Sequence, residues 1–186
     1  KQYAEVSGRL TDGLVSWWAL DVSGLSDELV TNGDMESGTS THGAYIVPAL
    51  GWQVGYQGLA STSLNSTDPI NGKYDFYVDA KVVASYPGIC TNGFSITDNA
   101  QYQISFKWKT GGQAIKMRVN NSNTGAGQGA TVVDETLTNR IADSSGTFTQ
   151  TVTANATTTA YFWIYQTNAN KDVYWFDDVS IKEVQV

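Results

Sequence analysis

The chain has 186 residues, enough for one well-buried domain with some length to spare. Its formal net charge of −7 argues against nucleic acid as the main partner, because phosphate binding needs clustered Lys and Arg. A single cysteine, Cys90, and a single histidine, His42, exclude a disulfide within the chain and a Cys/His zinc site, and no apolar run is long enough for a transmembrane helix.

The first 26 residues contain a strongly apolar segment, LTDGLVSWWALDVSG at 10–24, with the pattern of a strand followed by a turn. Neighbouring side chains of a strand point to opposite faces, so Trp17 and Trp18 give both faces an aromatic ring that needs cover. A strand on the outside of one sandwich has core on only one side. We therefore expect residues 1–26 to form an arm that packs on another chain or domain through Leu14, Trp17 and Trp18.

The stretch ELVTNGDMESG at 28–38 places Asn32, Asp34 and Glu36 at alternate positions around Gly33. In a strand these three oxygen-bearing side chains would share one face. Such a set could solubilise a sheet edge, cap a turn or bind a hard cation. The pattern by itself leaves these three alternatives open.

Four later segments alternate apolar and polar side chains with period two, as half-buried antiparallel strands do. They are QYQISFKWKT at 101–110, AIKMRVN at 114–120, GTFTQTVTA at 146–154 and DVYWFDDVSIKEV at 172–184. The sets predicted to share a face are Tyr102, Ile104, Phe106 and Trp108; Ile115, Met117 and Val119; Phe148, Gln150 and Val152; and Val173, Trp175, Val179 and Ile181. From these sets we assign Trp108 and Trp175 to the core.

Frequent turn signals separate these segments, for example TNG at 31–33 and DPING at 68–72. No segment keeps a helical period, so we expect no helix longer than about three turns. Many short strands with frequent turns predict an all-β fold, an antiparallel two-sheet β-sandwich, over residues 27–186. The Cys…Trp…Cys signature of immunoglobulin domains is absent, which favours a jelly roll.

The ordered set of ELVTNGDMESG, GWQV, QYQISFKWKT, YFWIYQT and VYWFDDVSIKEV resembles carbohydrate-binding modules of the family 4/9/22 type, which are galactose-binding-like jelly rolls. The resemblance covers residues 27–186. Separately, LTDGLVSWWALD looks like the opening strand of a laminin-G or concanavalin-like domain, in a combination similar to those of phage and bacterial surface proteins. The resemblance implies a fold more directly than a function, because function depends on the site.

In the resembling family, the early Asn-Gly-x-x-Glu segment and an Asp near the final strand often hold a structural Ca²⁺. The resemblance therefore implies a metal site at Glu36 and Asp177, completed by backbone carbonyls, with Asp178 as the neighbouring alternative. Such a site would tie the first and last strands together. The competing interpretation is that Asp34 and Glu36 cap a turn and that Asp177 bonds to backbone amides.

A sugar site would combine flat rings with planar polar groups, because the apolar face of a pyranose stacks on a ring while its hydroxyls need hydrogen bonds. The chain supplies 6 Trp and 10 Tyr. The candidate platforms are Trp52, Tyr56, Tyr86, Tyr165 and Tyr174, and the candidate polar contacts are Gln103, Lys107, Arg118 and Gln166.

The function expected from this resemblance is a non-catalytic glycan-binding module of an extracellular or virion-surface, tail-fibre-like protein. The alternative is a structural or assembly subunit of a virion or extracellular filament, with the N-terminal strand in subunit contacts. We expect glycan or polysaccharide as partner, a homo-oligomer or other subunits, and no membrane insertion. An enzyme is not expected, since no nucleophile motif lies near His42. The start at Lys1, without Met or a signal peptide, predicts a processed protein or an excerpt of a longer one.

Deleting residues 1–26 should weaken self-association while leaving the jelly roll folded. Burying one Trp side chain at an interface is worth roughly 1.5–3 kcal/mol or somewhat more. Light scattering on the full-length and truncated proteins measures the change. Two monomers at the same concentration would contradict the prediction.

Overall fold

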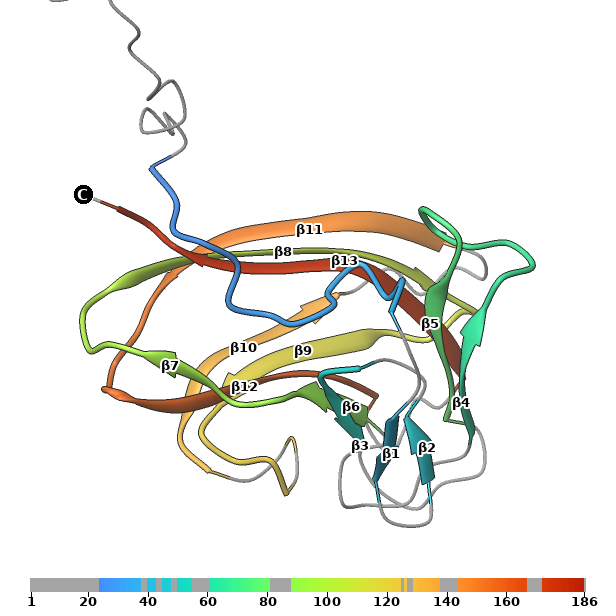
Figure 1. The fold of residues 1–186 in the computed structure, drawn as a ribbon, viewed down its shortest axis with the longest axis horizontal. Coiled ribbons are helices and arrows are strands. Elements are labelled where there is room, and N and C mark those ends of the chain that lie inside the picture. Colours follow the sequence, from blue (N-terminus) through green and yellow to red (C-terminus); the bar gives the residue numbers. More distant parts are fainter. Residues whose placement is uncertain are drawn as a thin grey trace, which may run out of the picture.

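The computed structural model describes residues 24–37, 40–42, 45–47, 50–54, 61–80, 88–124, 126, 129–137, 144–166 and 172–185. These residues form strands and turns, with no helix among them, and two antiparallel sheets lie face to face (Figure 1). The predicted fold class, an all-β two-sheet sandwich of the jelly-roll type, is confirmed. Over the same ranges, no helix has the length and apolar character needed to cross a membrane.

One sheet has five strands in the order β11 (Ser144–Thr153), β8 (Gln101–Thr110), β13 (Val173–Glu183), β5 (Asp75–Asp79) and β4 (Ser61–Asn65). The other has six, in the order β10 (Thr131–Leu137), β9 (Ile115–Asn120), β12 (Thr158–Tyr165), β6 (Gly88–Thr91) and β3 (Trp52–Val54), with β7 (Phe94–Ile96) also on β12. A separate pair is formed by β1 (Ser40–His42) and β2 (Tyr45–Val47).

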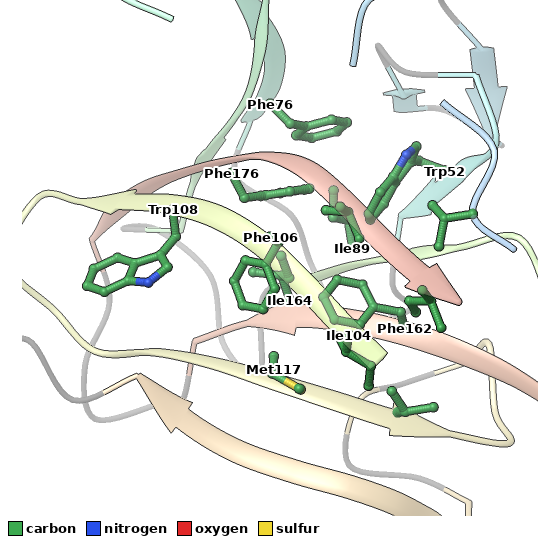
Figure 2. Packing of buried hydrophobic residues seen from close by; sticks show 14 of the residues in the cluster. Trp52, Phe76, Ile89, Ile104, Phe106, Trp108, Met117, Phe162, Ile164 and Phe176 are labelled. Atoms are coloured by element: carbon green, nitrogen blue, oxygen red, sulfur yellow. The ribbon is translucent and has the colours of Figure 1, made fainter. Parts of the chain in front are cut away.

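The core lies between the two sheets and is rich in aromatic rings. The period-two pattern placed the correct side chains there on β8 and β9: Tyr102, Ile104, Phe106, Trp108, Ile115, Met117 and Val119 are all buried. Figure 2 shows Trp52 beside Phe76 and Phe176, and its ring centre is 5.2 Å from that of Phe176. Aromatic pairs at this distance add to the free energy gained from area burial alone.

The strand β13 departs from the predicted alternation because it contains a bulge. Asp177 pairs with Lys107 and Ser180 pairs with Ser105, so three steps along β13 match two steps along β8. One extra residue inverts which side chains point inward. Before the bulge, the buried residues are therefore the even-numbered Tyr174 and Phe176, and after it they are the odd-numbered Val179 and Ile181. The assignment of Trp175 to the core was wrong: its side chain is only partly buried and belongs to the outer face.

The stretch at 31–37 forms a turn, not a strand end, and it closes over this bulge. The Val179 N–H donates to the Gly33 carbonyl at 2.8 Å. A Cβ at position 33 would lie 1.8 Å from the Val179 carbonyl oxygen, so only glycine fits there. The amide of Asn32 donates to the carbonyls of Ser37 and Leu50, which holds the turn against the residues before β3.

Residues 24–30 run alongside the end of β13, as the blue segment in Figure 1 shows. The Gln185 N–H donates to the Gly24 carbonyl and the Ser26 N–H donates to the Glu183 carbonyl. Residues 24–26 are thus bonded to the sandwich, and a truncation that spares these bonds ends at position 23. Leu14, Trp17 and Trp18 lie outside the described residues, so the predicted assembly role of the arm stays a prediction.

Replacing Trp52 by Ala should destabilise the sandwich by about 3–5 kcal/mol, because it leaves a large cavity among the core rings. The matched control is Trp175→Ala on the outer face, where a partly exposed ring is removed and the loss should be less than half as large. Urea unfolding followed by Trp fluorescence and circular dichroism measures both. Equal losses would contradict the opposite placement of the two rings.

Candidate functional site

Four of the residues predicted to contact sugar are buried. The exposed fractions are 2% for Trp52, 1% for Tyr165, and 0% for Gln166 and Tyr174. The Trp52 ring packs in the core, where its Nε1 donates to the Asn32 carbonyl. The Tyr174 hydroxyl points inward and donates to the Ile164 carbonyl. None of these rings has a face open to a ligand, so the platform roles predicted for Trp52, Tyr165 and Tyr174, and the contact predicted for Gln166, were wrong for this structure.

The predicted polar contacts are not brought together. Gln103 and Lys107 lie on the outer face of the five-stranded sheet, whereas Arg118 lies on the outer face of the six-stranded sheet. Tyr56 and Tyr86 lie outside the described residues. The predicted set therefore does not form one groove, because it draws on both sides of the sandwich.

The outer face of the six-stranded sheet carries a second apolar cluster. Cys90, Trp163 and Tyr165 are buried there together with Ala126 from the turn after β9. The Trp163 Nε1 donates to the Ser122 carbonyl at 2.9 Å, and the Arg118 guanidinium donates to the Ala126 carbonyl. These bonds fix the turn over the sheet. The predicted burial of Cys90 is confirmed, and this face is largely occupied by its own chain.

The outer face of the five-stranded sheet instead presents a row of side chains across four strands. Lys109 on β8 pairs in register with Trp175 on β13, Trp175 pairs with Tyr77 on β5, and Tyr77 pairs with Ser63 on β4. The rings of Tyr77 and Trp175 are 5.4 Å apart between centres and tilted by 53°. Both rings are partly exposed, which makes them the aromatic pair on this face that a ligand can reach.

A hollow of about 380 Å³ lies over this row. It is lined by Ser63, Leu64, Asn65, Ser66, Thr67, Tyr77 and Trp175. We call it the Tyr77–Trp175 hollow. It combines two rings with hydroxyl and amide groups, which is the composition that a sugar site requires.

Hydrogen bonds fix the wall of the hollow formed by the turn after β4. The Asn65 amide donates to a carboxylate oxygen of Asp75 at 3.0 Å, and the Thr67 N–H donates to the Asn65 carbonyl oxygen. A carboxylate oxygen of Asp75 also accepts from the Ile70 N–H at 3.0 Å. The turn is thus anchored to the first residue of β5, which keeps the wall in place before any ligand arrives.

Charges surround the hollow. The Lys109 ammonium lies 5.3 Å from the Trp175 ring centre and 2.9 Å from a carboxylate oxygen of Asp68. The pKa of Tyr77 is raised, first by burial and then by the negative charges of Asp79 and Asp172. Its hydroxyl therefore stays protonated at neutral pH and can donate a hydrogen bond.

The two predicted calcium ligands meet at one loop, residues 70–74. A carboxylate oxygen of Glu36 accepts from the N–H groups of Lys73 and Tyr74 at 2.6 and 3.0 Å. The Asp177 carboxylate accepts from the N–H groups of Asn71 and Asp178 at 3.1 and 2.7 Å. These bonds agree with the competing interpretation, in which the carboxylates bond to backbone amides.

The fit of this pair to Ca²⁺ is incomplete on the described residues. They contain no cluster of three or more His, Cys, Asp or Glu side chains that would hold a metal. Because Ca²⁺ takes about six to eight oxygen ligands, backbone carbonyls would have to supply most of them. Burial, together with the negative charge of Asp178, raises the pKa of Asp177 to about 7, so the site would favour a compensating cation. The calcium site stays a prediction.

Comparison with known proteins shows a shared fold. No family model matches the chain, and no curated protein matches it. Three solved structures do: an arabinose-bound MgGH51 α-L-arabinofuranosidase (TM-score 0.64, 12% identity, 86% of this chain and 27% of that one), the Stig cyclase Fisc from Fischerella sp. TAU (0.61, 13%, 86% and 98%) and the CBM22-1 xylan-binding domain of Xyn10C from Paenibacillus barcinonensis (0.55, 16%, 82% and 92%). The chain thus has the jelly-roll fold of carbohydrate-binding modules, and it spans about a quarter of the arabinofuranosidase.

The sequence reasoning missed Tyr77 and Trp175, the two rings of the hollow. Trp175 was assigned to the core because the alternation was continued through the bulge. The doublet Asp177-Asp178 inside an apolar strand was the available signal, since two adjacent carboxylates cannot both fit a regular half-buried alternation. Tyr77 pairs with Trp175 only through the tertiary register of β5 and β13.

Chelation of calcium should lower the melting temperature, since an ion that binds only the folded state stabilises it by about 2.7 kcal/mol at a hundred times its dissociation constant. The matched control is Glu36→Gln, which keeps an oxygen acceptor for the loop amides but removes a charge, so its melting temperature should not respond to chelator. Differential scanning calorimetry with and without EDTA measures both. Identical wild-type curves would leave the backbone-amide interpretation alone.

Proposed function

We propose that this chain is a non-catalytic glycan-binding module and that the Tyr77–Trp175 hollow is its binding site. The observation that carries the proposal is the tilted pair of partly exposed rings next to the hydroxyl and amide groups of Ser63, Asn65 and Thr67. The apolar face of a sugar ring packs on an aromatic ring, while its hydroxyls exchange hydrogen bonds with such groups. The likeness to a xylan-binding domain supports the proposal through the fold alone.

The lining of the hollow favours binding without catalysis. Tyr77 is the one titratable side chain among its lining residues, and its pKa lies above the usual tyrosine value. General acid–base catalysis at neutral pH needs a group whose pKa lies near the working pH. Glycoside hydrolysis commonly uses two carboxylates across the sugar, whereas Asp75, the nearest one in the wall, bonds to the Asn65 amide and the Ile70 N–H.

We further propose that the module works outside the cell, on an extracellular or virion-surface protein such as a tail fibre. A low content of charged residues, 16%, and a surface rich in Thr, Ser and Asn are compatible with that setting. The alternative role as an assembly subunit depends on residues 1–23, whose packing is outside the described part of the chain.

The test is affinity electrophoresis of the wild type through gels containing xylan, galactomannan or β-glucan, followed by calorimetry on any polysaccharide that retards it. Trp175→Ala and Tyr77→Ala should each weaken binding by about tenfold, since one aromatic contact is worth up to about 1.5 kcal/mol beyond area burial.

Tyr161→Ala is the matched control, because Tyr161 is a partly exposed tyrosine on the outer face of the other sheet. Its binding should equal that of the wild type. Loss of binding in Tyr161→Ala with retention in Trp175→Ala would move the site to the six-stranded sheet. No retardation on any polysaccharide would contradict the proposed function.

A further inference from the structure

The positive charges beside the hollow are already compensated. On β8, the Lys109 ammonium is 2.9 Å from the Asp68 carboxylate, and the Lys107 ammonium is 2.7 Å from the Asp178 carboxylate. Lys109 is the cation that stands over the Trp175 ring. A sugar stacked on Trp175 would therefore meet an ion pair and not a single positive charge.

The other side of the hollow is negative. Asp79 on β5 and Asp172 before β13 both act on the Tyr77 hydroxyl and raise its pKa, after the larger effect of burial. Asp75 lies behind the wall and accepts hydrogen bonds from Asn65 and Ile70. Around the two rings, carboxylates thus outnumber ammonium groups, so the local potential is negative.

We propose that the Tyr77–Trp175 hollow selects uncharged glycans over acidic ones, and that Asp68 sets this selectivity by neutralising Lys109. This inference rests on the proposed function, since it specifies the ligand class of the same site. A carboxylate or sulfate on a stacked sugar would lie close to Asp68, Asp79 and Asp172, and like charges brought together reduce affinity. An uncharged sugar keeps the ring contact and the hydrogen bonds without that repulsion.

The structure offers a clean way to expose the Lys109 charge. The Asp68 side chain is 80% exposed, and it is the backbone carbonyl of Asp68 that accepts from Asn65. Asp68→Asn therefore removes one negative charge while leaving the bonds of the wall intact. The control is Asp27→Asn, which removes the same charge from an exposed position near the Glu183 end of β13, far along the strand from Trp175.

The experiment measures the ratio of affinities for polygalacturonate and for the uncharged polysaccharide that binds best. In Asp68→Asn this ratio should rise by about threefold to fivefold at low ionic strength, the size of effect that exposed charge pairs give. The gain should disappear at 1 M salt, where charges are screened within about 3 Å. Asp27→Asn should leave the ratio unchanged, and the double variant Asp68→Asn/Lys109→Gln should lose the gain.

The outcomes separate the two proposals. If the wild type binds uncharged polysaccharide but Asp68→Asn shows no rise in the ratio, the inference is overturned and the proposed function stands. The same holds if the wild type binds polygalacturonate as tightly as uncharged polysaccharide. If the wild type binds no glycan, both are overturned. Circular dichroism of each variant confirms that differences in binding do not come from unfolding.

Discussion

One extra residue in β13 determines both the core and the outer surface of the five-stranded sheet. Asp177 and Ser180 pair with Lys107 and Ser105, so the strand contains a bulge between them. A regular strand could bury Phe176 or Val179, but not both, because the side-chain period is two. The bulge allows both to be buried and leaves Trp175 pointing outward.

The bulge is held by segments that are far away in the sequence. Gly33 accepts from the Val179 N–H, and the Asn71 N–H donates to the Asp177 carboxylate. Asp178 adopts a φ of 50°, a left-handed conformation that Asp tolerates better than most residues. The loop at 70–74 that contacts Asp177 follows the turn that forms a wall of the hollow. The packing at the bulge and the shape of the proposed site are therefore connected through one stretch of chain.

The two outer faces of the sandwich use their aromatic residues differently. On the six-stranded sheet, Trp163 and Tyr165 are buried under the turn that contains Ala126, so these rings stabilise the fold. On the five-stranded sheet, Tyr77 and Trp175 remain partly exposed beside polar groups. The same fold occurs in a glycosidase, a cyclase and a xylan-binding domain, which means that the fold does not choose between these activities. The chemistry of the exposed face carries the argument for glycan binding.

The sequence alone determined the fold class and the inward faces of β8 and β9, because regular strands obey a local period of two that side-chain polarity reveals. It also indicated that Glu36 and Asp177 meet, although this came from a family resemblance. Only the tertiary structure decided which tryptophans are exposed. Trp52 is buried because strands from both sheets surround it, and Trp175 is exposed because distant segments stabilise a bulge that inverts the alternation. Neither cause is local, so a period read along the chain cannot contain it.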